Sequence, residues 1–519
     1  MSEVNSRPTL PAAAICERAL VARDARFDGI FYVGITTTRV YCRPTCPARV
    51  SHTDRRRFFD SAASAERAGF RPCLRCRPEL APGRAPMDAV PRLARVAADR
   101  IGAGALNGHS VADLATELGV SARHLRRALE REIGVSPLEL AQTHRLLLAK
   151  RLLADTALPV TRIAFASGFQ SLRRFNSIFR ERYRLSPGAL RRQGHSRGAP
   201  LSGPVPSGDL VPLTLAYRPP LAWDALLAHL GQEAMPGVEV VERRRYSRTV
   251  WVAGRGGVVV VEDAVPGARG NGHRRGHENQ LTAWVSAALL PVLMPLLARL
   301  RQLFDLDAEP TVVDAHLELG GLGQLVRRSP GLRMPGAFDG FEVALGALIR
   351  SPGSSAERGE DLAGRVVSAL GEPLATEIPG LTHVAPTPRR IAGAGPRSLE
   401  ALGVERRRAE NIVAIARAVL EGTLRLELGG DASSARRALM DLGDAGDRLA
   451  TIIVMRALRR PDAFPASDPV LQRAAGVSSE LELRATAERW RPWRGYAALH
   501  LWRHFEESCV GQASLPPAP

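Results

Sequence analysis

The chain has 519 residues, 45% of them hydrophobic, so it is long enough for several domains with apolar cores. Its net charge of +18 is uneven, because residues 1–200 hold 34 Lys and Arg against 17 Asp and Glu, whereas the remaining residues hold 37 against 36. The first 200 residues are therefore expected to bind a polyanion, and a uniformly basic or an acidic protein is excluded.

The compartment signals argue against secretion and membrane insertion. Met1–Leu10 is polar and contains Pro8, unlike a signal peptide. The longest uncharged run, Gln280–Ala298, contains Pro291 and Pro295, which disfavour a membrane span. Few cysteines outside one cluster are typical of a reducing compartment. We expect a cytoplasmic, nucleoid-associated protein with no membrane partner.

Residues 1–80 are predicted to form a small metal domain, with strands in FYVGITTTRVYC and a short helix at Ser64–Gly69. Four of the six cysteines follow the spacing C-x(3)-C-x(26)-C-x(2)-C, and they are Cys42, Cys46, Cys73 and Cys76. Two close thiol pairs at this separation predict one tetrahedral Zn²⁺ site. The spacing alone leaves open whether the zinc is only a structural staple or part of a reactive centre.

The segments YCRPTC and GFRPCLRCRP resemble the N-terminal domain of the Ada-type methyl-phosphotriester methyltransferases. The resemblance implies that Cys42 is both a zinc ligand and the nucleophile that accepts the methyl group. Cys46, Cys73 and Cys76 are then its co-ligands. A zinc-bound sulfur is a thiolate at neutral pH, which suits this chemistry.

Residues 86–195 are predicted to be helical and repeat a helix-turn-helix pattern with an offset of 49 to 50 residues. Each copy has a turn glycine, Gly119 or Gly168, and a serine N-cap, Ser121 or Ser171. Buried stripes are expected in both second helices, at Leu125, Ala128, Leu129, Leu172, Phe175 and Phe179. Arginines occupy the opposite faces, at Arg123, Arg126, Arg127, Arg131, Arg173, Arg174, Arg180 and Arg182.

This arrangement resembles the AraC-type regulators, whose two units enter successive turns of the major groove. The resemblance implies double-stranded DNA as a partner, with RNA polymerase as a further partner of an activator. Gln170 and Arg173 are the expected base contacts. The other predicted DNA-binding residues of the two units are Arg123, Arg126, Arg127 and Arg174.

The composition changes after a predicted linker at 196–209. We expect an α+β subdomain at 210–325, with one helix near Trp223–Gln232 and a buried loop and helix at Leu281–Leu306, then a helical domain at 326–505 and a tail at 506–519. The predicted fold class is multidomain and mostly α with α+β parts.

PGAFDGFE, DAFPASD and WRPWRGYAALHLW resemble the helix-hairpin-helix DNA glycosylases of the AlkA type. The resemblance implies that Asp468 is catalytic, that Trp502 belongs to the base pocket, and that alkylated DNA is a substrate. Asp468 followed by Pro469 is also an ideal helix N-cap, and both roles are compatible. Gly443 and Gly446 of the hairpin are the expected DNA contacts, with a bound monovalent cation.

The glycosylase pattern departs from the family at three places. Asp444 and Asp447 add negative charge to the hairpin, which opposes a DNA phosphate. Arg448 stands where the family has tryptophan, and Ile452 where it commonly has tyrosine. In residues 347–355 a proline replaces the residue that fills the gap left by an extruded base.

Three hypotheses follow. The first is a bifunctional protein that accepts methyl groups, binds DNA as a regulator and excises alkylated bases such as 3-methyladenine. The second is an alkylation-responsive transcription factor whose glycosylase-like domain is inactive. The third is a zinc-containing DNA-binding protein without chemistry.

Overall fold

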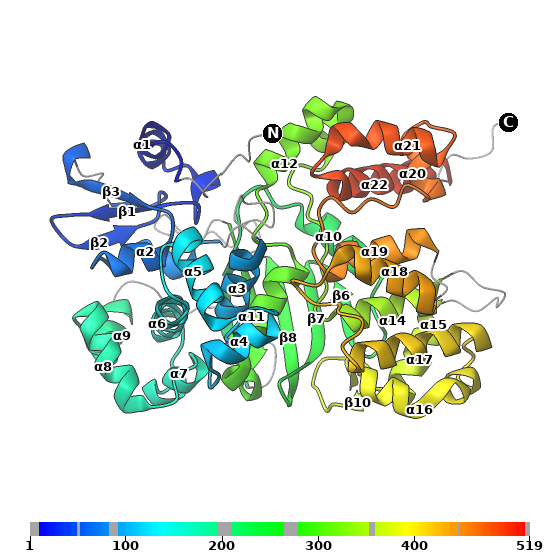
Figure 1. The fold of residues 1–519 in the computed structure, drawn as a ribbon, viewed down its shortest axis with the longest axis horizontal. Coiled ribbons are helices and arrows are strands. Elements are labelled where there is room, and N and C mark those ends of the chain that lie inside the picture. The colour runs from blue at the N-terminus through cyan, green and yellow to red at the C-terminus, as the bar shows by residue number, and fades with distance from the viewer. Residues whose placement is uncertain are drawn as a thin grey trace. The chain divides into compact units, whose positions relative to one another are not determined.

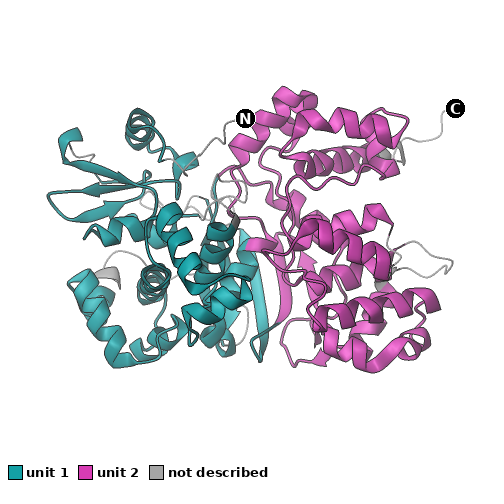
Figure 2. Ribbon diagram, in the orientation of Figure 1, with its two compact units in different colours: residues 1–218, 251–301 teal, residues 219–250, 302–519 magenta. Residues whose placement is uncertain are grey.

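The computed structural model describes residues 10–48, 52–82, 92–195, 209–263, 279–351, 359–443 and 446–513 (Figure 1). The chain divides into two compact units (Figure 2): unit 1 comprises residues 1–218 and 251–301, and unit 2 comprises residues 219–250 and 302–519. The region expected as one subdomain at 210–325 contributes to both units. Except for Asp209, the predicted linker lies outside the described residues.

The metal part of unit 1 is a small sheet with short helices. The predicted strands are present, the helix predicted at Ser64–Gly69 begins two residues earlier and ends at Arg67, and the helix at Ala13–Ala22 was not predicted. Its strand order is β3-β1-β2-β4, with β1 antiparallel to β2 and β3, and β2 parallel to β4. The elements are α1 (Ala13–Ala22), β1 (Tyr32–Ile35), β2 (Val40–Cys42), β3 (Arg56–Phe59), α2 (Ala62–Arg67) and β4 (Arg71–Pro72). Strands of two to four residues bury little apolar surface, so the cysteine cluster is expected to stabilise this part.

The next part of unit 1 is helical, and both predicted helix-turn-helix repeats are present. The helices are α3 (Arg92–Gly102), α4 (Val111–Glu117), α5 (Ala122–Ile133), α6 (Pro137–Asp155), α7 (Val160–Ala166), α8 (Leu172–Tyr183) and α9 (Pro187–His195). Gly119 and Gly168 have positive φ values, 69° and 85°, in the turns of the two repeats. The long helix α6 connects the repeats and packs against α2 of the metal part.

The last part of unit 1 corrects one prediction. Gln280–Ser286 forms strand β9, which pairs antiparallel with β5 (Leu210–Ala216) and β8 (Arg255–Asp263). The sequence pattern predicts a buried loop here. Leu281, Ala283 and Val285 are buried and Gln280, Thr282 and Ser286 are half-buried, so the strand alternates except at the buried Trp284. The segment that follows is helical, with α11 at Leu293–Leu303.

Unit 2 is mostly helical, as predicted, and α10 (Trp223–Gln232) matches its expected bounds. It also contains the antiparallel pair β6 (Glu239–Glu242) and β7 (Arg245–Val252), whose last two residues belong to unit 1. The other elements are α12 (Pro310–Leu317), α13 (Gly323–Arg328), α14 (Gly340–Arg350), α15 (Gly359–Leu370), β10 (Glu372–Pro373), β11 (His383–Val384), α16 (Pro388–Ala401), α17 (Arg406–Leu420), α18 (Ala432–Gly443), α19 (Asp447–Ala457), α20 (Pro469–Ala474), α21 (Glu480–Ala487) and α22 (Arg494–Ala513). Helix α22 continues past the predicted domain end at residue 505.

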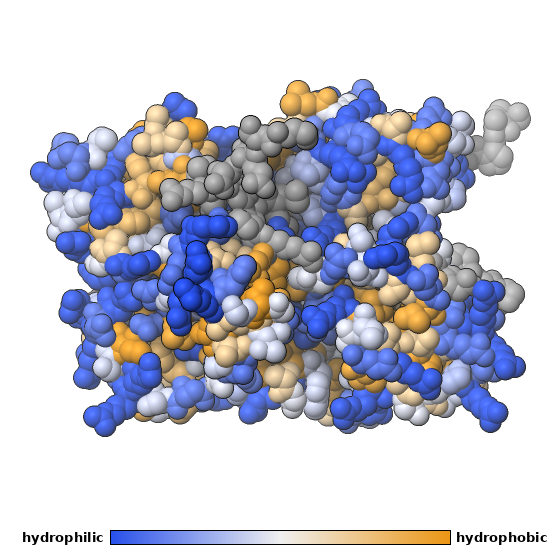
Figure 3. Space-filling view, viewed as in Figure 1, coloured by the Kyte–Doolittle hydropathy of each residue, from blue (hydrophilic) through white to orange (hydrophobic). Residues whose placement is uncertain are grey.

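The face in Figure 3 is largely hydrophilic, with apolar residues in separate small patches. No helix of the described residues is both long and apolar enough to cross a membrane.

Candidate active sites and nucleic-acid interface

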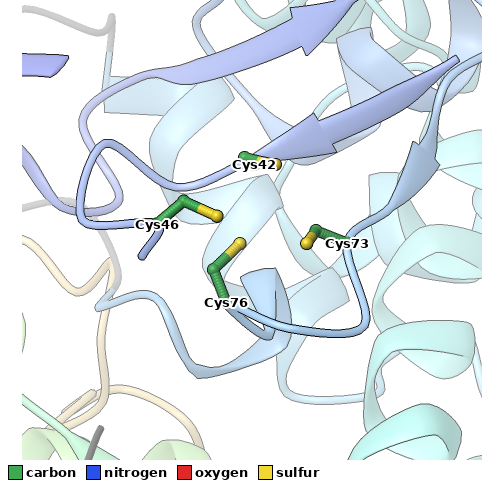
Figure 4. A group of neighbouring side chains, drawn as sticks. All are labelled: Cys42, Cys46, Cys73 and Cys76. Carbon is green, nitrogen blue, oxygen red and sulfur yellow. The ribbon is translucent and has the colours of Figure 1, made fainter. Parts of the chain in front are cut away.

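The four predicted zinc ligands come together in unit 1. Cys42 ends β2 and Cys73 follows β4, and the parallel pairing of these strands places the two cysteines side by side. Cys46 and Cys76 lie in the loops that follow. All four side chains point toward one another, with their Sγ atoms within 4.8 Å of each other (Figure 4).

The donor set fits zinc. Four sulfur atoms this close cannot all be deprotonated without a cation. Accordingly, hydrogen bonds with Cys46 and Cys73 raise the pKa of Cys42, whereas hydrogen bonds with Cys42, Cys46 and Cys76 lower the pKa of Cys73. A divalent ion removes this conflict, and buried soft thiolates favour Zn²⁺.

The sulfurs differ in their contacts with the backbone. The Arg43 N–H donates to Cys76 Sγ at 3.4 Å, and the Arg75 N–H donates to Cys73 Sγ at 3.3 Å. Within the described residues, no backbone N–H donates to Cys42 Sγ. A hydrogen bond to a thiolate lowers its basicity and nucleophilicity, and these backbone contacts lower those of Cys73 and Cys76 but not those of Cys42.

The two helix-turn-helix units hold their predicted arginines at the surface. Leu125, Leu129, Phe175 and Phe179 are fully buried, whereas Ala128 and Leu172 of the predicted stripes are half-buried. All six predicted DNA-binding residues are exposed: Arg123, Arg126, Arg127, Gln170, Arg173 and Arg174. Exposed guanidinium groups on second helices suit phosphate oxygens and guanine edges.

Arg182 does not belong to this surface, contrary to expectation. It lies near the end of α8, where its side chain turns inward. Its Nη1 donates to the carbonyl of Glu66 at 2.8 Å, and its Nε lies 3.8 Å from the Glu66 carboxylate. Arg182 therefore connects the second repeat to the metal part.

Asp468 begins α20 in unit 2 as the predicted N-cap, with Pro469 at the first helical position. Its Oδ1 accepts from the N–H groups of Val470 and Leu471, at 2.7 and 3.1 Å. Its Oδ2 accepts from Arg448 Nε at 2.5 Å. The Asp468 side chain is completely buried and its carboxylate is held rigidly.

Four family models match successive parts of the chain: metal binding domain of Ada at 15–79, helix-turn-helix domain at 114–193, AlkA N-terminal domain at 212–339, and HhH-GPD superfamily base excision DNA repair protein at 354–489. A protein of Mycobacterium tuberculosis H37Rv named "Probable bifunctional transcriptional activator/DNA repair enzyme AlkA" is 36% identical over 505 residues, which cover 95% of this chain and 96% of that protein.

The chain belongs to this bifunctional AlkA family.

Two further relatives each match part of this AlkA-family chain. DNA-3-methyladenine glycosylase 2 of Escherichia coli K12 is 35% identical over 289 residues, covering 56% of this chain and 96% of that protein. The bifunctional transcriptional activator/DNA repair enzyme Ada of the same strain is 31% identical over 121 residues, covering 23% of this chain and 32% of that protein. The resemblances inferred from the sequence are thereby confirmed.

The hairpin that departs from the AlkA pattern is described only in part. Gly443 ends α18 and the exposed Gly446 is the N-cap of α19, whereas Asp444 lies outside the described residues. Arg436 Nε donates to Asp447 Oδ1 at 2.7 Å. This pairing offsets the negative charge of Asp447, so its repulsion of a DNA phosphate is weaker than expected. Among the described residues, no contact shows whether the hairpin binds the expected monovalent cation.

The structure describes the predicted base-pocket residue Trp502 and part of the segment 347–355. Trp502 is half-buried in α22, which packs against the helix α20 that Asp468 begins. Of the segment expected to lack the gap-filling residue, Ala347–Arg350 belongs to α14, whereas residues 352–355 lie outside the described residues.

Sequence reasoning missed two buried charges that connect the metal part to α6 and α8. Glu66 accepts from Tyr41 Oη at 3.1 Å and from Thr143 Oγ1 at 3.0 Å. Lys150 donates to the Cys73 carbonyl at 3.2 Å and pairs with Glu79. Burial raises the pKa of Glu79, but the charges of Lys150 and Arg77 outweigh it and lower the pKa overall. Lys150 is the only lysine in the sequence and lies in the leucine-rich run LLLAKRLLA, and this pattern could have identified it.

Proposed function

We propose that the chain repairs alkylated DNA and regulates the response to the damage. Cys42 accepts a methyl group from a DNA methyl-phosphotriester, the helix-turn-helix units bind duplex DNA, and the C-terminal helical part excises alkylated bases such as 3-methyladenine through Asp468. The observation that carries this proposal is that backbone N–H groups donate to the sulfurs of Cys73 and Cys76, whereas none in the described part of the chain donates to Cys42 Sγ. The names of the relatives support the same combination.

Methyl transfer to Cys42 is a single displacement. Zinc, when held by the four cysteines, keeps their sulfurs deprotonated. The Cys42 sulfur attacks the methyl carbon, an S–C bond forms, the C–O bond breaks, and its electron pair stays on the phosphate oxygen. The thioether is stable, so each chain accepts one methyl group. The cluster loses one negative charge, which reduces its repulsion from DNA and connects repair to DNA binding.

Methyl transfer is tested with duplex DNA containing methyl-phosphotriesters. After incubation we expect the peptide containing Cys42 to gain the mass of one methyl group in the wild type and nothing in Cys42→Ser. Cys16→Ser is the control, because Cys16 is buried outside the cluster and should not affect uptake. Methyl found on Cys46 instead of Cys42 would contradict the assignment.

Asp468 is suited to stabilise a cationic sugar. In base excision the C1′–N bond breaks with its electron pair going to the base, and water adds to C1′ and loses a proton. A cationic alkylated purine is already a good leaving group and needs no general acid. A fixed carboxylate beside C1′ stabilises the positive charge that develops on the sugar, once the nucleotide is extruded from the stack.

Base excision is tested with duplex DNA containing 3-methyladenine. We expect release by the wild type and none by Asp468→Asn, although asparagine still caps α20. The matched control is Asp339→Asn, because Asp339 caps α14 in the same way, accepting from two backbone N–H groups at 2.9 and 3.3 Å. Equal release by the wild type and Asp468→Asn would remove Asp468 from the chemistry.

A second candidate function is an alkylation-responsive transcription factor that does not cleave bases. The ion pair between Arg448 and Asp468 favours it, because the guanidinium offsets the negative charge that a sugar cation needs. Methyl uptake on Cys42 without base release by the wild type would decide for this function. As a regulator in either case, the chain acts in the cytoplasm at the nucleoid, with RNA polymerase as a partner.

A further inference from the structure

The two members of the Arg448–Asp468 ion pair differ in exposure. The Asp468 side chain is fully buried, whereas 45% of the Arg448 side chain is exposed. Two backbone N–H groups occupy Asp468 Oδ1, and Arg448 occupies Oδ2. The guanidinium is therefore the part of the pair that an approaching substrate meets first.

The acidic residue next to Arg448 in the chain does not compete for this pair. Its chain neighbour Asp447 is directed to Arg436 and lies 3.6 Å from Arg484. Among the described residues, Asp468 is the acidic partner of Arg448. The hairpin thus adds a cation beside the carboxylate that we assign to catalysis.

The position of the carboxylate determines what Arg448 can contact. A carboxylate that stabilises the sugar cation has to lie next to C1′. The departing base is bonded to the same carbon. A guanidinium that contacts this carboxylate therefore lies within reach of the base.

We propose that Arg448 is a specificity-determining residue that shifts base excision from cationic alkylated purines toward neutral damaged purines. This inference rests on the proposed glycosylase function. A guanidinium repels a base with a full positive charge. It donates hydrogen bonds to the nitrogen and oxygen acceptors on the edge of a neutral base.

The charge balance of the reaction supports the same direction. In both cases the C1′–N electron pair goes to the base, and water adds to C1′ and releases a proton. A cationic base leaves as a neutral molecule, whereas a neutral base gains negative charge as it leaves. Arg448 stabilises only the second of these charge changes.

The test compares single-turnover release of cationic 7-methylguanine and neutral hypoxanthine from otherwise identical duplexes. We expect the ratio of the cationic to the neutral rate to rise about tenfold or more in Arg448→Gln and Arg448→Trp. Arg448→Lys preserves the charge and should keep the ratio within about twofold of the wild type. An unchanged ratio in Arg448→Gln would overturn the inference, because a purely structural residue changes both rates together.

A binding measurement separates this inference from the proposed function. Duplexes carrying a cationic pyrrolidine or a neutral tetrahydrofuran in place of the sugar probe the charge beside C1′ without turnover. We expect Arg448→Gln to prefer the cationic analogue about tenfold more than the wild type does, because Asp468 is no longer paired. If the wild type releases neither base, the proposed excision fails. An equal binding ratio in both proteins rejects the charge effect of Arg448 independently of turnover.

Discussion

Glu66 has almost no contact with water, yet it is surrounded by groups from three elements. It accepts from Tyr41 of β2 and Thr143 of α6, and it faces Arg182 of α8 and Lys150 of α6. Burial raises the pKa of Glu66 to about 7, although these four neighbours lower it. A single carboxyl group therefore joins the strand that carries Cys42 to the second helix-turn-helix unit.

The raised pKa of Glu66 predicts a pH-dependent stability. The folded state binds a proton more readily than the unfolded state between pH 4.5 and about 7, so the free energy of unfolding falls as the pH rises through this window. The shift corresponds to roughly 3 kcal/mol. We expect Glu66→Gln to gain stability relative to the wild type by this order between pH 4.5 and 8, measured by denaturant unfolding. Protonation of the zinc ligands affects both proteins and cancels in the difference, and a difference independent of pH would reject the shift.

The helices α5 and α8 show how local capping positions a DNA-binding surface. Ser121 accepts from the His124 N–H at 3.2 Å, and Ser171 accepts from the Arg174 N–H at 3.3 Å. Each cap fixes the first turn of a helix whose exposed face carries the predicted DNA contacts. Loss of a cap loosens this turn and its arginines.

Removal of the cap in Ser171→Ala should lower the free energy of unfolding by about 1 kcal/mol and weaken binding to duplex DNA. Ser171→Asn keeps a side-chain acceptor and should stay close to the wild type in both measurements. The control is Ser479→Ala in unit 2, where Ser479 caps α21 by accepting from Glu482 N–H at 3.2 Å. It should lower stability similarly without weakening DNA binding. If Ser171→Ala binds DNA as tightly as the wild type, the cap does not contribute to DNA recognition.

At the scale of the whole molecule, the positive charge is concentrated in the first 200 residues, which carry the cysteine cluster and both helix-turn-helix units. Basic residues that contact phosphates release counterions, so affinity for DNA falls with salt in proportion to the number of such contacts. The remaining residues are almost neutral and hold the buried Asp468. This distribution assigns most nonspecific DNA affinity to the first 200 residues.

The salt dependence of DNA binding tests this distribution. We expect Arg126→Ala and Arg174→Ala each to reduce the slope of log affinity against log salt concentration by about 1. Arg406→Ala is the matched control, because Arg406 is an exposed arginine of unit 2 paired with Glu410. Its slope should equal that of the wild type, and fluorescence anisotropy with a labelled duplex measures all three. A larger change in the control would place the main phosphate contacts in unit 2.

Features encoded over short distances could be predicted from the sequence. The cysteine spacing specifies the ligand cluster, Ser121 and Ser171 act on N–H groups three residues away, and Asp468 with Pro469 starts a helix by itself. Treating Gln280–Ala298 as one uncharged run with two prolines hides strand β9, although Gln280–Ser286 alternates polar and apolar residues except at the buried Trp284.

The sequence by itself determined which chemical groups this protein carries: a four-thiol cluster, two arginine-bearing repeats and a capping aspartate. Only the tertiary structure decided what those groups contact. It brought Arg448 onto Asp468 across 20 residues and Arg182 onto Glu66 across 116. Charge pairing between distant segments depends on how helices pack and not on spacing along the chain, so no local pattern predicts it.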